Sequence, residues 1–252
     1  MGFSMVDKST TTSHKPGIRA TLIPCLPIIK GTLAGTWWSP ASGGKIARVF
    51  LGSYEHEQTR LMANSFRQNS VFFDVGAHHG YYSLIASRVS GGGARIVAFE
   101  PDQENIAFLR KHVRANGLDQ VEIVESAVGA EAGTVGFSKG TGTGTGHIAE
   151  NGDVQVPLVT LDDEVRRRNL CPTHIKIDVE GAEVDVLTGA QDTLQKHRPV
   201  LFLSTHGDRA HADCCRMLAS MDYRLEPILG DSVETTTEIF CVPAEQQLEI
   251  AA

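Results

Sequence analysis

Three carboxylates and a histidine have the types and spacing for acid–base chemistry. Asp178, Glu180 and Glu183 lie within six residues, and His206 follows the next apolar segment. Acidic residues also stabilise the start of a helix, but three are more than capping needs. A histidine or carboxylate within hydrogen-bond reach of an alkyl hydroxyl can act as its general base. We therefore take His206, Asp178 and Glu180 as candidate catalytic residues and expect Glu183 to be structural.

Three mechanisms are open to such a group. His206 oriented by Asp178 would form a dyad, since a carboxylate fixes the tautomer of the imidazole and raises its basicity. His78 or His79 could serve as the base instead, because they lie in a turn that precedes a helix. A divalent metal held by Asp178, Glu180 and His206 would lower the pKa of the hydroxyl directly. The sequence leaves these mechanisms open, and the predicted set of site residues assigns no metal ligands.

A glycine-rich turn after a buried strand predicts where a ligand binds. Residues 71–80 read Val-Phe-Phe-Asp-Val-Gly-Ala-His-His-Gly, an apolar run that leads through Asp74 into a turn between Gly76 and Gly80. This pattern is typical of the first strand and helix of an open parallel α/β sheet. A dinucleotide site needs a glycine where this chain has His78, because the backbone must approach the pyrophosphate. The turn therefore favours a nucleoside ligand without a pyrophosphate, such as S-adenosylmethionine (SAM).

Two later strand ends complete the predicted cofactor site. A second strand, residues 95–99, ends at Glu100, whose carboxylate can accept hydrogen bonds from both ribose hydroxyls. NAD enzymes use an acidic residue similarly, so Glu100 alone does not identify the ligand. A third strand, residues 121–124, precedes Ser126 and Ala127, which are small enough to flank an adenine ring. The predicted cofactor-binding residues are Asp74, Gly76, Ala77, His78, Gly80, Glu100, Pro101, Ser126, Ala127 and Asp178.

Several short motifs follow one another in a recognisable order. They are Asp74–Ala77 with Gly80, Tyr82 and Ser83, then Ala98–Pro101, Leu161–Asp163, Ile175–Glu183 and Leu187–Ala190. Together they resemble the FkbM-type SAM-dependent methyltransferases over about residues 50–205, and the block from Lys176 to Glu183 is the most specific. The resemblance implies O-methylation of a hydroxyl on a sugar or polyketide-like molecule, with SAM as cofactor. Two positions depart from the family: His78 stands where Asn is usual, and Ser204 where Glu is frequent.

The elements that position these residues predict an α/β, Rossmann-like class I methyltransferase fold, with a mostly parallel seven-stranded sheet and helices on both faces. The fourth and fifth strands are expected at residues 174–178 and 199–205. The resemblance places an antiparallel finish at residues 223–227 and 238–242. A helix is expected at residues 102–115, where apolar residues recur at helical spacing and Asn-Gly follows.

A small hairpin is expected between the third and fourth strands. Its strands are residues 133–137 and 154–159, and a Gly-Thr repeat occupies residues 139–147 between them. Glycine has high backbone entropy and the repeat has no apolar anchor, so we expect a mobile loop. Such a loop beside the cofactor site could close over a substrate, and the alternative is a plain hairpin tip.

The chain divides into three predicted regions. Residues 1–16 are polar and are expected to be a disordered tail; residues 17–50 form an N-terminal extension, and residues 51–252 form the methyltransferase domain. The extension is expected to be a packing arm, with a lid or a homodimer contact as alternatives. At the start of the domain, Glu55 and Glu57 are candidates to face the methionine end of SAM.

Composition narrows the classes of partner. The 252 residues are 41% hydrophobic and 21% charged, which is typical of a globular protein. The net charge of −7 and the lack of a dense basic run argue against nucleic acid as a substrate. Five cysteines without Cys-x-x-Cys spacing indicate reduced thiols in a cytoplasmic protein rather than disulfides or zinc. No run approaches the roughly 18 apolar residues of a membrane span. The expected partner is therefore a small-molecule hydroxyl acceptor.

Two other functions stay open at this point. An N-methyltransferase acting on a small amine or peptide would need no strong base, so replacement of His206 should distinguish it from an O-methyltransferase. A non-catalytic methyltransferase-like subunit that binds a protein partner is kept open by the departures at His78 and Ser204. An NAD oxidoreductase is disfavoured because the turn lacks the second glycine.

Overall fold

The computed structural model describes residues 22–140, 144–149 and 151–247. The predicted tail, residues 1–16, and the first part of the extension lie outside this described part of the chain. Among the described helices, none combines the length and the apolar character that crossing a membrane requires.

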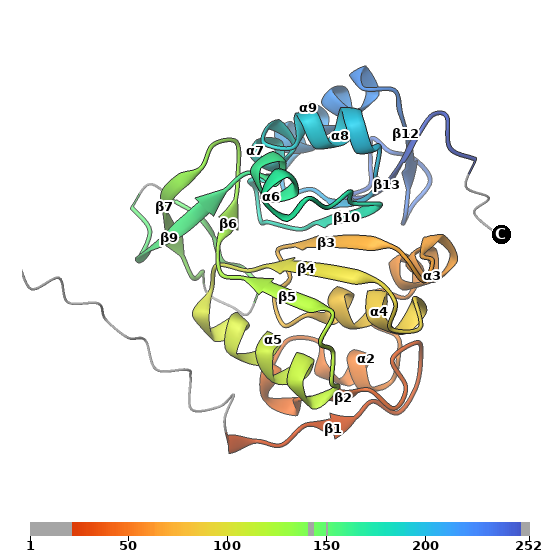
Figure 1. Ribbon diagram of the computed structural model, residues 1–252, viewed down its shortest axis with the longest axis vertical. Coiled ribbons are helices and arrows are strands. Elements are labelled where there is room, and N and C mark those ends of the chain that lie inside the picture. The colour runs from red at the N-terminus through yellow and green to blue at the C-terminus, as the bar shows by residue number, and fades with distance from the viewer. Residues whose placement is uncertain (1–21, 141–143, 150, 248–252) are drawn as a thin grey trace, which may run out of the picture.

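Seven strands form the central sheet. They are β3 (Val71–Val75), β4 (Arg95–Phe99), β5 (Val121–Val124), β10 (His174–Ile177), β11 (Val200–Ser204), β12 (Tyr223–Pro227) and β13 (Glu238–Pro243). Their order in space is β12-β13-β11-β10-β3-β4-β5 (Figure 1). Neighbours from β11 to β5 run parallel, whereas β13 runs antiparallel to both β11 and β12. The predicted mostly parallel, seven-stranded Rossmann-like sheet is confirmed, with strand ends within about a residue of those expected.

The inner strands are apolar on both faces because both faces are covered. Successive side chains of a strand point to opposite sides of the sheet. In β3, Phe72 belongs to one hydrophobic core and Phe73 to the other, and in β4 the same holds for Ile96 and Val97. A few of the buried strand positions are polar or charged, and one of them, Lys176 in β10, is 0% exposed. A charged side chain in the middle of this sheet is therefore a feature that needs an explanation.

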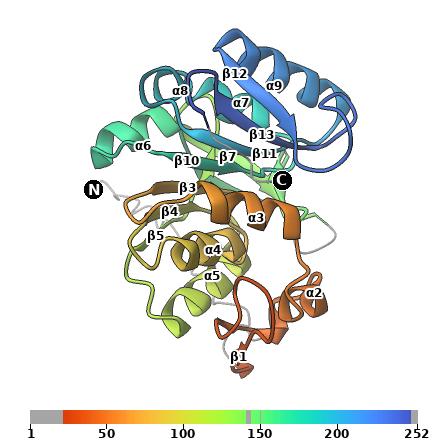
Figure 2. The ribbon, with the colours of Figure 1, turned by 90° about the vertical axis from the view of Figure 1, so that its right-hand side faces the viewer.

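Helices cover both faces of the sheet (Figures 1 and 2). On one face lie α3 (His56–Ser65), α4 (Tyr81–Val89) and α5 (Gln103–Ala115); on the other lie α6 (Leu161–Arg168), α7 (Glu183–Thr188), α8 (Gln191–His197) and α9 (Asp208–Ser220). The start of α5 is fixed by Asp102, whose side chain accepts from the N–H groups of Glu104 and Asn105. The predicted helix at 102–115 is thus confirmed, with Asp102 as its N-cap.

A second, four-stranded sheet stands beside the carboxyl edge of the first. Its strands are β6 (Ala127–Val128), β7 (Gly133–Ser138), β8 (His147–Ile148) and β9 (Val154–Val159), in the order β6-β9-β7-β8. The antiparallel pairing of β7 with β9 confirms the predicted hairpin. The Gly-Thr repeat lies partly outside the described residues, and its mobility stays a prediction. Its end forms β8, which pairs with β7.

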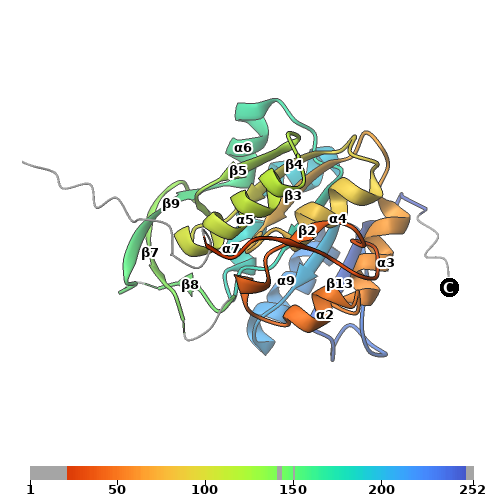
Figure 3. The same ribbon diagram turned by 90° about the horizontal axis from the view of Figure 1, so that it is seen from below.

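The described part of the N-terminal extension packs against the helices α4 and α5 (Figure 3). It contains β1 (Leu26–Pro27), β2 (Trp37–Trp38), the 3₁₀ helix η1 (Pro40–Ser42) and α2 (Ile46–Phe50). Trp38 stacks on the ring of His112 with centroids 3.9 Å apart. The backbone N–H of Ser39 donates to His112 Nε2 at 3.0 Å, so Nδ1 carries the proton donated to the carbonyl of His79 at 2.8 Å. One buried histidine therefore links the extension to the glycine turn.

Candidate active site

The carboxyl ends of the parallel strands bring the predicted site residues to one edge of the sheet. Val75 is paired in register with both Phe99 and Ile177, and Ile177 is paired with Leu203. The residues that follow these positions therefore meet at this edge. The edge includes the point between β3 and β10 where the strand order reverses, which is where open α/β sheets bind their ligands.

Gly76 opens the turn after β3 in a conformation that favours glycine. Its φ is +81°, and its N–H donates to the carbonyl of Phe99 at 3.0 Å. A Cβ atom at this position would lie 1.8 Å from the backbone oxygen of Asp178. Gly80, with φ +86°, ends the turn as the N-cap of α4. The turn can thus pass close to the chain that follows β10 only because Gly76 has no side chain.

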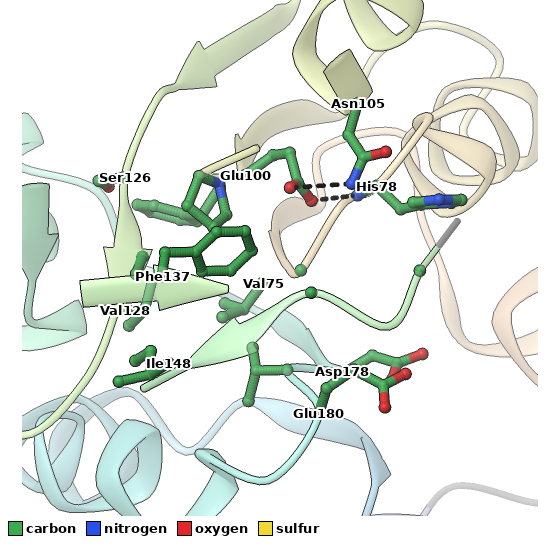
Figure 4. Close-up of a pocket in the computed structure, with 17 residues that line it drawn as sticks. Val75, His78, Glu100, Asn105, Ser126, Val128, Phe137, Ile148, Asp178 and Glu180 are labelled. Atoms are coloured by element: carbon green, nitrogen blue, oxygen red, sulfur yellow. Dashed lines mark hydrogen bonds between the residues drawn. The ribbon is translucent and has the colours of Figure 1, made fainter. Parts of the chain in front are cut away.

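Glu100 is buried at the end of β4 and holds the glycine turn in place. Its Oε2 accepts from the N–H of His78 at 2.8 Å, and its Oε1 accepts from the N–H of Asp102 at 2.9 Å and from Asn105 Nδ2 at 3.2 Å (Figure 4). Burial raises the pKa of Glu100 to about 7, although these donors lower it. The carboxylate therefore connects the turn after β3 with the first turn of α5.

A cavity, which we call the Glu100 cavity, opens in front of this carboxylate (Figure 4). The rings of Phe99 and Phe137 and the side chain of Ile148 give it apolar walls. Ser126 Oγ is buried and has no hydrogen-bond partner among the described residues. Of the predicted cofactor-binding residues, the cavity is lined by Gly76, His78, Glu100, Pro101, Ser126, Ala127 and Asp178. An apolar slot with a carboxylate and an unpartnered hydroxyl suits a nucleoside.

The remaining three predicted cofactor-binding residues have other places. Asp74 lies beneath the turn, where its buried carboxylate accepts from Ser83 Oγ at 2.6 Å. Burial raises the pKa of Asp74 to about 6, and Ser83 lowers it. Ala77 lines the neighbouring cavity described below, and Gly80 packs against Leu109 on α5. Asp74 and Gly80 therefore help to shape the turn.

His206 and Glu183 form a hydrogen-bonded pair at this edge of the sheet. Glu183 is 0% exposed, and its Oε1 lies 2.8 Å from His206 Nδ1 and accepts from the N–H of Gly181 at 2.9 Å. The predicted partner Asp178 is farther away, with its Oδ1 3.9 Å from His206 Nε2. Glu183, rather than Asp178, therefore orients the ring. The tight turn before α7, where Glu180 and Gly181 both have positive φ, places Glu183 behind the histidine.

His206 Nε2 faces two more carboxylates. It lies 3.6 Å from Glu180 Oε1, in addition to its approach to Asp178. The hydrogen bond to Glu183 raises the pKa of His206, burial opposes this, and the charges of Glu180 and Asp178 raise it further. The ligand atoms of Asp178, Glu180 and His206 lie within 4.8 Å of one another, so they could also hold a divalent ion. Both the base and the metal mechanism thus fit this group.

A second cavity of about 410 Å³, which we call the His206 cavity, adjoins the first. Trp38, Lys45 and Tyr54, at or near the N-terminal extension, contribute to its wall. Glu55 also lines it and accepts from the hydroxyl of Tyr82, whereas Glu57, the other candidate, lies at the surface beside Arg60. The residues that line both cavities are Gly76, His78, Gly144, Asp178 and Glu180. Two small molecules could therefore meet at this shared wall.

Comparison with known proteins identifies the family to which the chain belongs. The family model described as Methyltransferase FkbM domain matches residues 74–225, which include the glycine turn, Glu100 and the His206 pair. The chain belongs to the FkbM methyltransferase family. The family expected from the sequence motifs is thereby confirmed.

Individual relatives of this FkbM methyltransferase are distant. Hexuronic acid methyltransferase AglP of Haloferax volcanii is 27% identical over 145 residues, or 56% of this chain and 58% of AglP. The ribosomal protein L11 methyltransferase of Caldanaerobacter subterraneus subsp. tengcongensis is 29% identical over 79 residues, or 30% of this chain and 25% of that protein. A solved FkbM methyltransferase from Methylobacillus flagellatus aligns with a TM-score of 0.54 and 21% identity, covering 70% of this chain and 44% of that one. The chain thus spans less than two thirds of each relative, and the structural likeness concerns the fold.

The two histidines of the turn differ from His206 in this FkbM methyltransferase. Burial lowers the pKa of His78 to about 4, and the neighbouring charge of Asp178 raises it only in part. His79 is buried between the ring of His78, 3.6 Å away, and Phe108. Burial makes both weak bases, whereas His206 is partly exposed and has a raised pKa. The electrostatics therefore favour His206 as the base.

Several residues that line or contact these cavities were not among the predicted site residues. Asn105 reaches Glu100 from the first turn of α5, and the ring of Phe137 arrives from the second sheet. Lys176 and Glu238 approach Asp178 and the His206 cavity from the central sheet. For Lys176, its place between two isoleucines in an otherwise apolar strand was a usable signal. Phe137 and Glu238 depend on pairings between distant segments, whereas Asn105 lies only five residues after its partner Glu100.

Proposed function

We propose that this FkbM methyltransferase transfers a methyl group from SAM to a hydroxyl of a small molecule, a sugar or a polyketide-like natural product. The shared wall of the Glu100 and His206 cavities carries this proposal. A methyl donor in the first cavity and an acceptor in the second would meet beside Gly76, Asp178 and Glu180. Holding two reactants in line is the main contribution that a protein makes to such a displacement.

The residues of the Glu100 cavity fit SAM. Glu100 would accept hydrogen bonds from the ribose hydroxyls, and the unpartnered hydroxyl of Ser126 would meet the adenine between Phe137 and the chain at Ala127. The methionine end would then lie toward Asp178, at the junction with the His206 cavity. When bound, SAM supplies a methyl group on a sulfonium centre that is already activated for transfer.

His206 is the proposed general base. In its neutral form, Nε2 accepts the proton of the acceptor hydroxyl, while Nδ1 keeps its proton in the hydrogen bond to Glu183. The buried carboxylate stabilises the imidazolium that results. Because the pKa of His206 is raised, the neutral fraction of the ring grows as the pH rises through that value. The rate of transfer should therefore increase with pH and then level off.

The charge of the His206 cavity supports a hydroxyl acceptor over an acidic one. Its lining includes the carboxylates of Glu55, Asp178, Glu180 and Glu238, and Lys45 is placed on the side of the extension. An acceptor carboxylate at the shared wall would be repelled by Asp178 and Glu180, whereas a hydroxyl can donate to them. AglP is named for hexuronic acid. We expect this chain to prefer an acceptor without a carboxylate at the reacting position.

Calorimetric titration with S-adenosylhomocysteine (SAH) and, separately, with NADH tests the cofactor. We expect SAH to bind with micromolar affinity and NADH not to bind. A panel of radiolabelled methyl-transfer assays with matched neutral, amino and acidic glycosides then tests the acceptor class. A protein that binds neither nucleotide would contradict the proposed function and favour a non-catalytic subunit that binds a partner.

Replacement of His206 by alanine tests the base. We expect the rate of methyl transfer to a hydroxyl to fall by about 10²- to 10⁴-fold, because the proton loses its acceptor. The affinity for SAH should change little, since His206 does not line the Glu100 cavity. His56→Ala, at an exposed histidine, is the matched control. A fall of less than about threefold would argue for transfer to an amine, which needs no strong base.

Removal of divalent ions separates the base from the metal mechanism. Asp178, Glu180 and His206 could hold an ion, and that ion would take over the role of lowering the hydroxyl's pKa. With His206 as the base, we expect full activity after exhaustive dialysis against EDTA. Activity that is lost on dialysis and restored by Mg²⁺ or Mn²⁺ would assign these three residues to a metal site instead.

A further inference from the structure

Lys176 is a buried charge that the proposed reaction does not yet use. It lies in β10, the middle strand of the central sheet, and is 0% exposed. Taking an ammonium group out of water is costly unless it is paired and hydrogen-bonded. A purely structural sheet would place an apolar residue here, as it does at the neighbouring Ile175 and Ile177. The partners of Lys176 therefore indicate what the charge is for.

The ammonium group of Lys176 joins the site to two other strands. It lies 3.2 Å from Asp178 Oδ2, at the edge where the cavities meet, and it donates to Ser204 Oγ on β11. Ser204 in turn donates to Glu238 Oε2 on β13 at 2.8 Å, and Gln58 donates to the same oxygen at 2.7 Å. Ser204 and Glu238 are direct partners in the antiparallel pairing of β11 with β13. The network is thus built across three adjacent strands.

Other acidic groups surround the same ammonium group. The ring of Tyr82 on α4 lies 5.3 Å from Lys176 Nζ, and its hydroxyl donates to Glu55 at the start of α3. Burial lowers the pKa of Lys176, but the charges of Asp178, Glu238 and Glu55 outweigh it and raise the pKa. Burial raises the pKa of Glu55 and of Asp74, and the charge of Lys176 opposes this rise in both. Lys176 is the counter-charge of a group of carboxylates.

We propose that Lys176 is a positioning residue that holds the carboxylate of Asp178 at the methionine end of the SAM site. This inference rests on the proposed function. Asp178 lines both cavities, and the methionine end of SAM carries an ammonium group that a carboxylate binds through a charge-assisted hydrogen bond. Glu238 acts through Ser204 to keep Lys176 in place. Without Lys176, the carboxylate of Asp178 loses the hydrogen bond that fixes its position, and the ligand's ammonium group loses a placed partner.

Titration with SAH tests this role without any knowledge of the acceptor. We expect Lys176→Met to bind SAH about tenfold more weakly than the wild type, the loss corresponding to one charge-assisted hydrogen bond. Asp178→Asn should also be weakened. The double variant should bind no more weakly than Asp178→Asn alone. Lys196→Met, at an exposed lysine of α8, is the matched control and should behave as the wild type.

Exchange of the two β-strand partners provides a test that keeps Lys176. Glu238→Ser should weaken SAH binding, and adding Ser204→Glu should restore the affinity to within about twofold. The exchange moves the carboxylate to the facing position of the same strand pair. This exchange tests the role of Lys176 even if the Lys176→Met variant fails to fold.

Different results would overturn the two proposals. A wild-type protein that does not bind SAH overturns the proposed function and this inference with it. Normal binding by the wild type, together with a folded Lys176→Met variant whose affinity matches it, overturns only the role of Lys176. That role is also overturned if the losses in Lys176→Met and Asp178→Asn add, or if Ser204→Glu fails to restore binding in the Glu238→Ser background.

Discussion

Replacing Gly76 by alanine is expected to destabilise the protein by about 3 kcal/mol or more, which is a large fraction of the total stability of a typical domain. The new Cβ atom would lie 1.8 Å from the backbone oxygen of Asp178, and that oxygen belongs to the chain directly after β10. To relieve this collision, the turn would have to move away from the central sheet. The free energy of unfolding, measured with urea, should fall while the m-value stays unchanged.

Gly92→Ala is a matched control for the backbone conformation. Gly92 has φ +82°, close to the +81° of Gly76, but no atom lies within 4 Å of where its Cβ would be. The cost of a side chain at positive φ is therefore common to both variants, and the difference isolates the collision with Asp178. We expect Gly92→Ala to lose about 1 kcal/mol. Equal losses in the two variants would show that the close approach at Gly76 is not a constraint on the fold.

Glu100→Ala is expected to weaken SAH binding by at least about 100-fold. The two ribose hydroxyls would lose their hydrogen bonds to the carboxylate, each worth about 1.5–3 kcal/mol when one partner is charged. The variant also leaves the N–H of His78 without its acceptor at the turn that faces the ligand. Calorimetry measures the affinity, and circular dichroism shows whether the fold is kept. Glu104→Ala, at an exposed position of α5, is the control.

The pH dependence of SAH binding gives a second signature of Glu100. Its pKa in the free protein is raised to about 7, and only the ionised form can accept from both ribose hydroxyls. Protonated Glu100 must therefore lose its proton when the ligand binds. The affinity should be constant above pH 7 and fall by up to about tenfold for each pH unit below it. An affinity that stays flat down to pH 5 would contradict the assignment of Glu100 to the ribose.

The features that the sequence predicted are local ones. The apolar run into Gly76 and the acidic residue after β4 are short patterns, and their structure follows from strand periodicity and turn chemistry. The second sheet was predicted only as a hairpin. Nothing in the residues around Phe137 indicated that β7 and β8 would turn its ring and Ile148 toward Glu100. These walls of the Glu100 cavity come from the second sheet, so they depend on how that sheet packs against the central sheet.

The partner of His206 shows the same limit at the level of single side chains. Asp178, Glu180 and Glu183 are equally available in the sequence, and the turn between them has positive φ at Glu180 and Gly181. That turn decides which carboxylate lies behind the imidazole. Glu238 was out of reach for a related reason, since its register against β11 depends on the long connection through α9 and β12.

His112 has a consequence for how this protein can change its substrate. The two nitrogens of one ring connect Ser39 of the extension to the carbonyl of His79, and Trp38 is stacked on the same ring. The segment that borders the acceptor and the turn that borders the methyl donor are thus fastened to each other. Transplanting the extension of another family member, as a route to a new acceptor, would disturb the donor site as well. A new acceptor specificity would have to arise by substitutions that keep these contacts of His112. The acceptor site and the donor site would therefore evolve together.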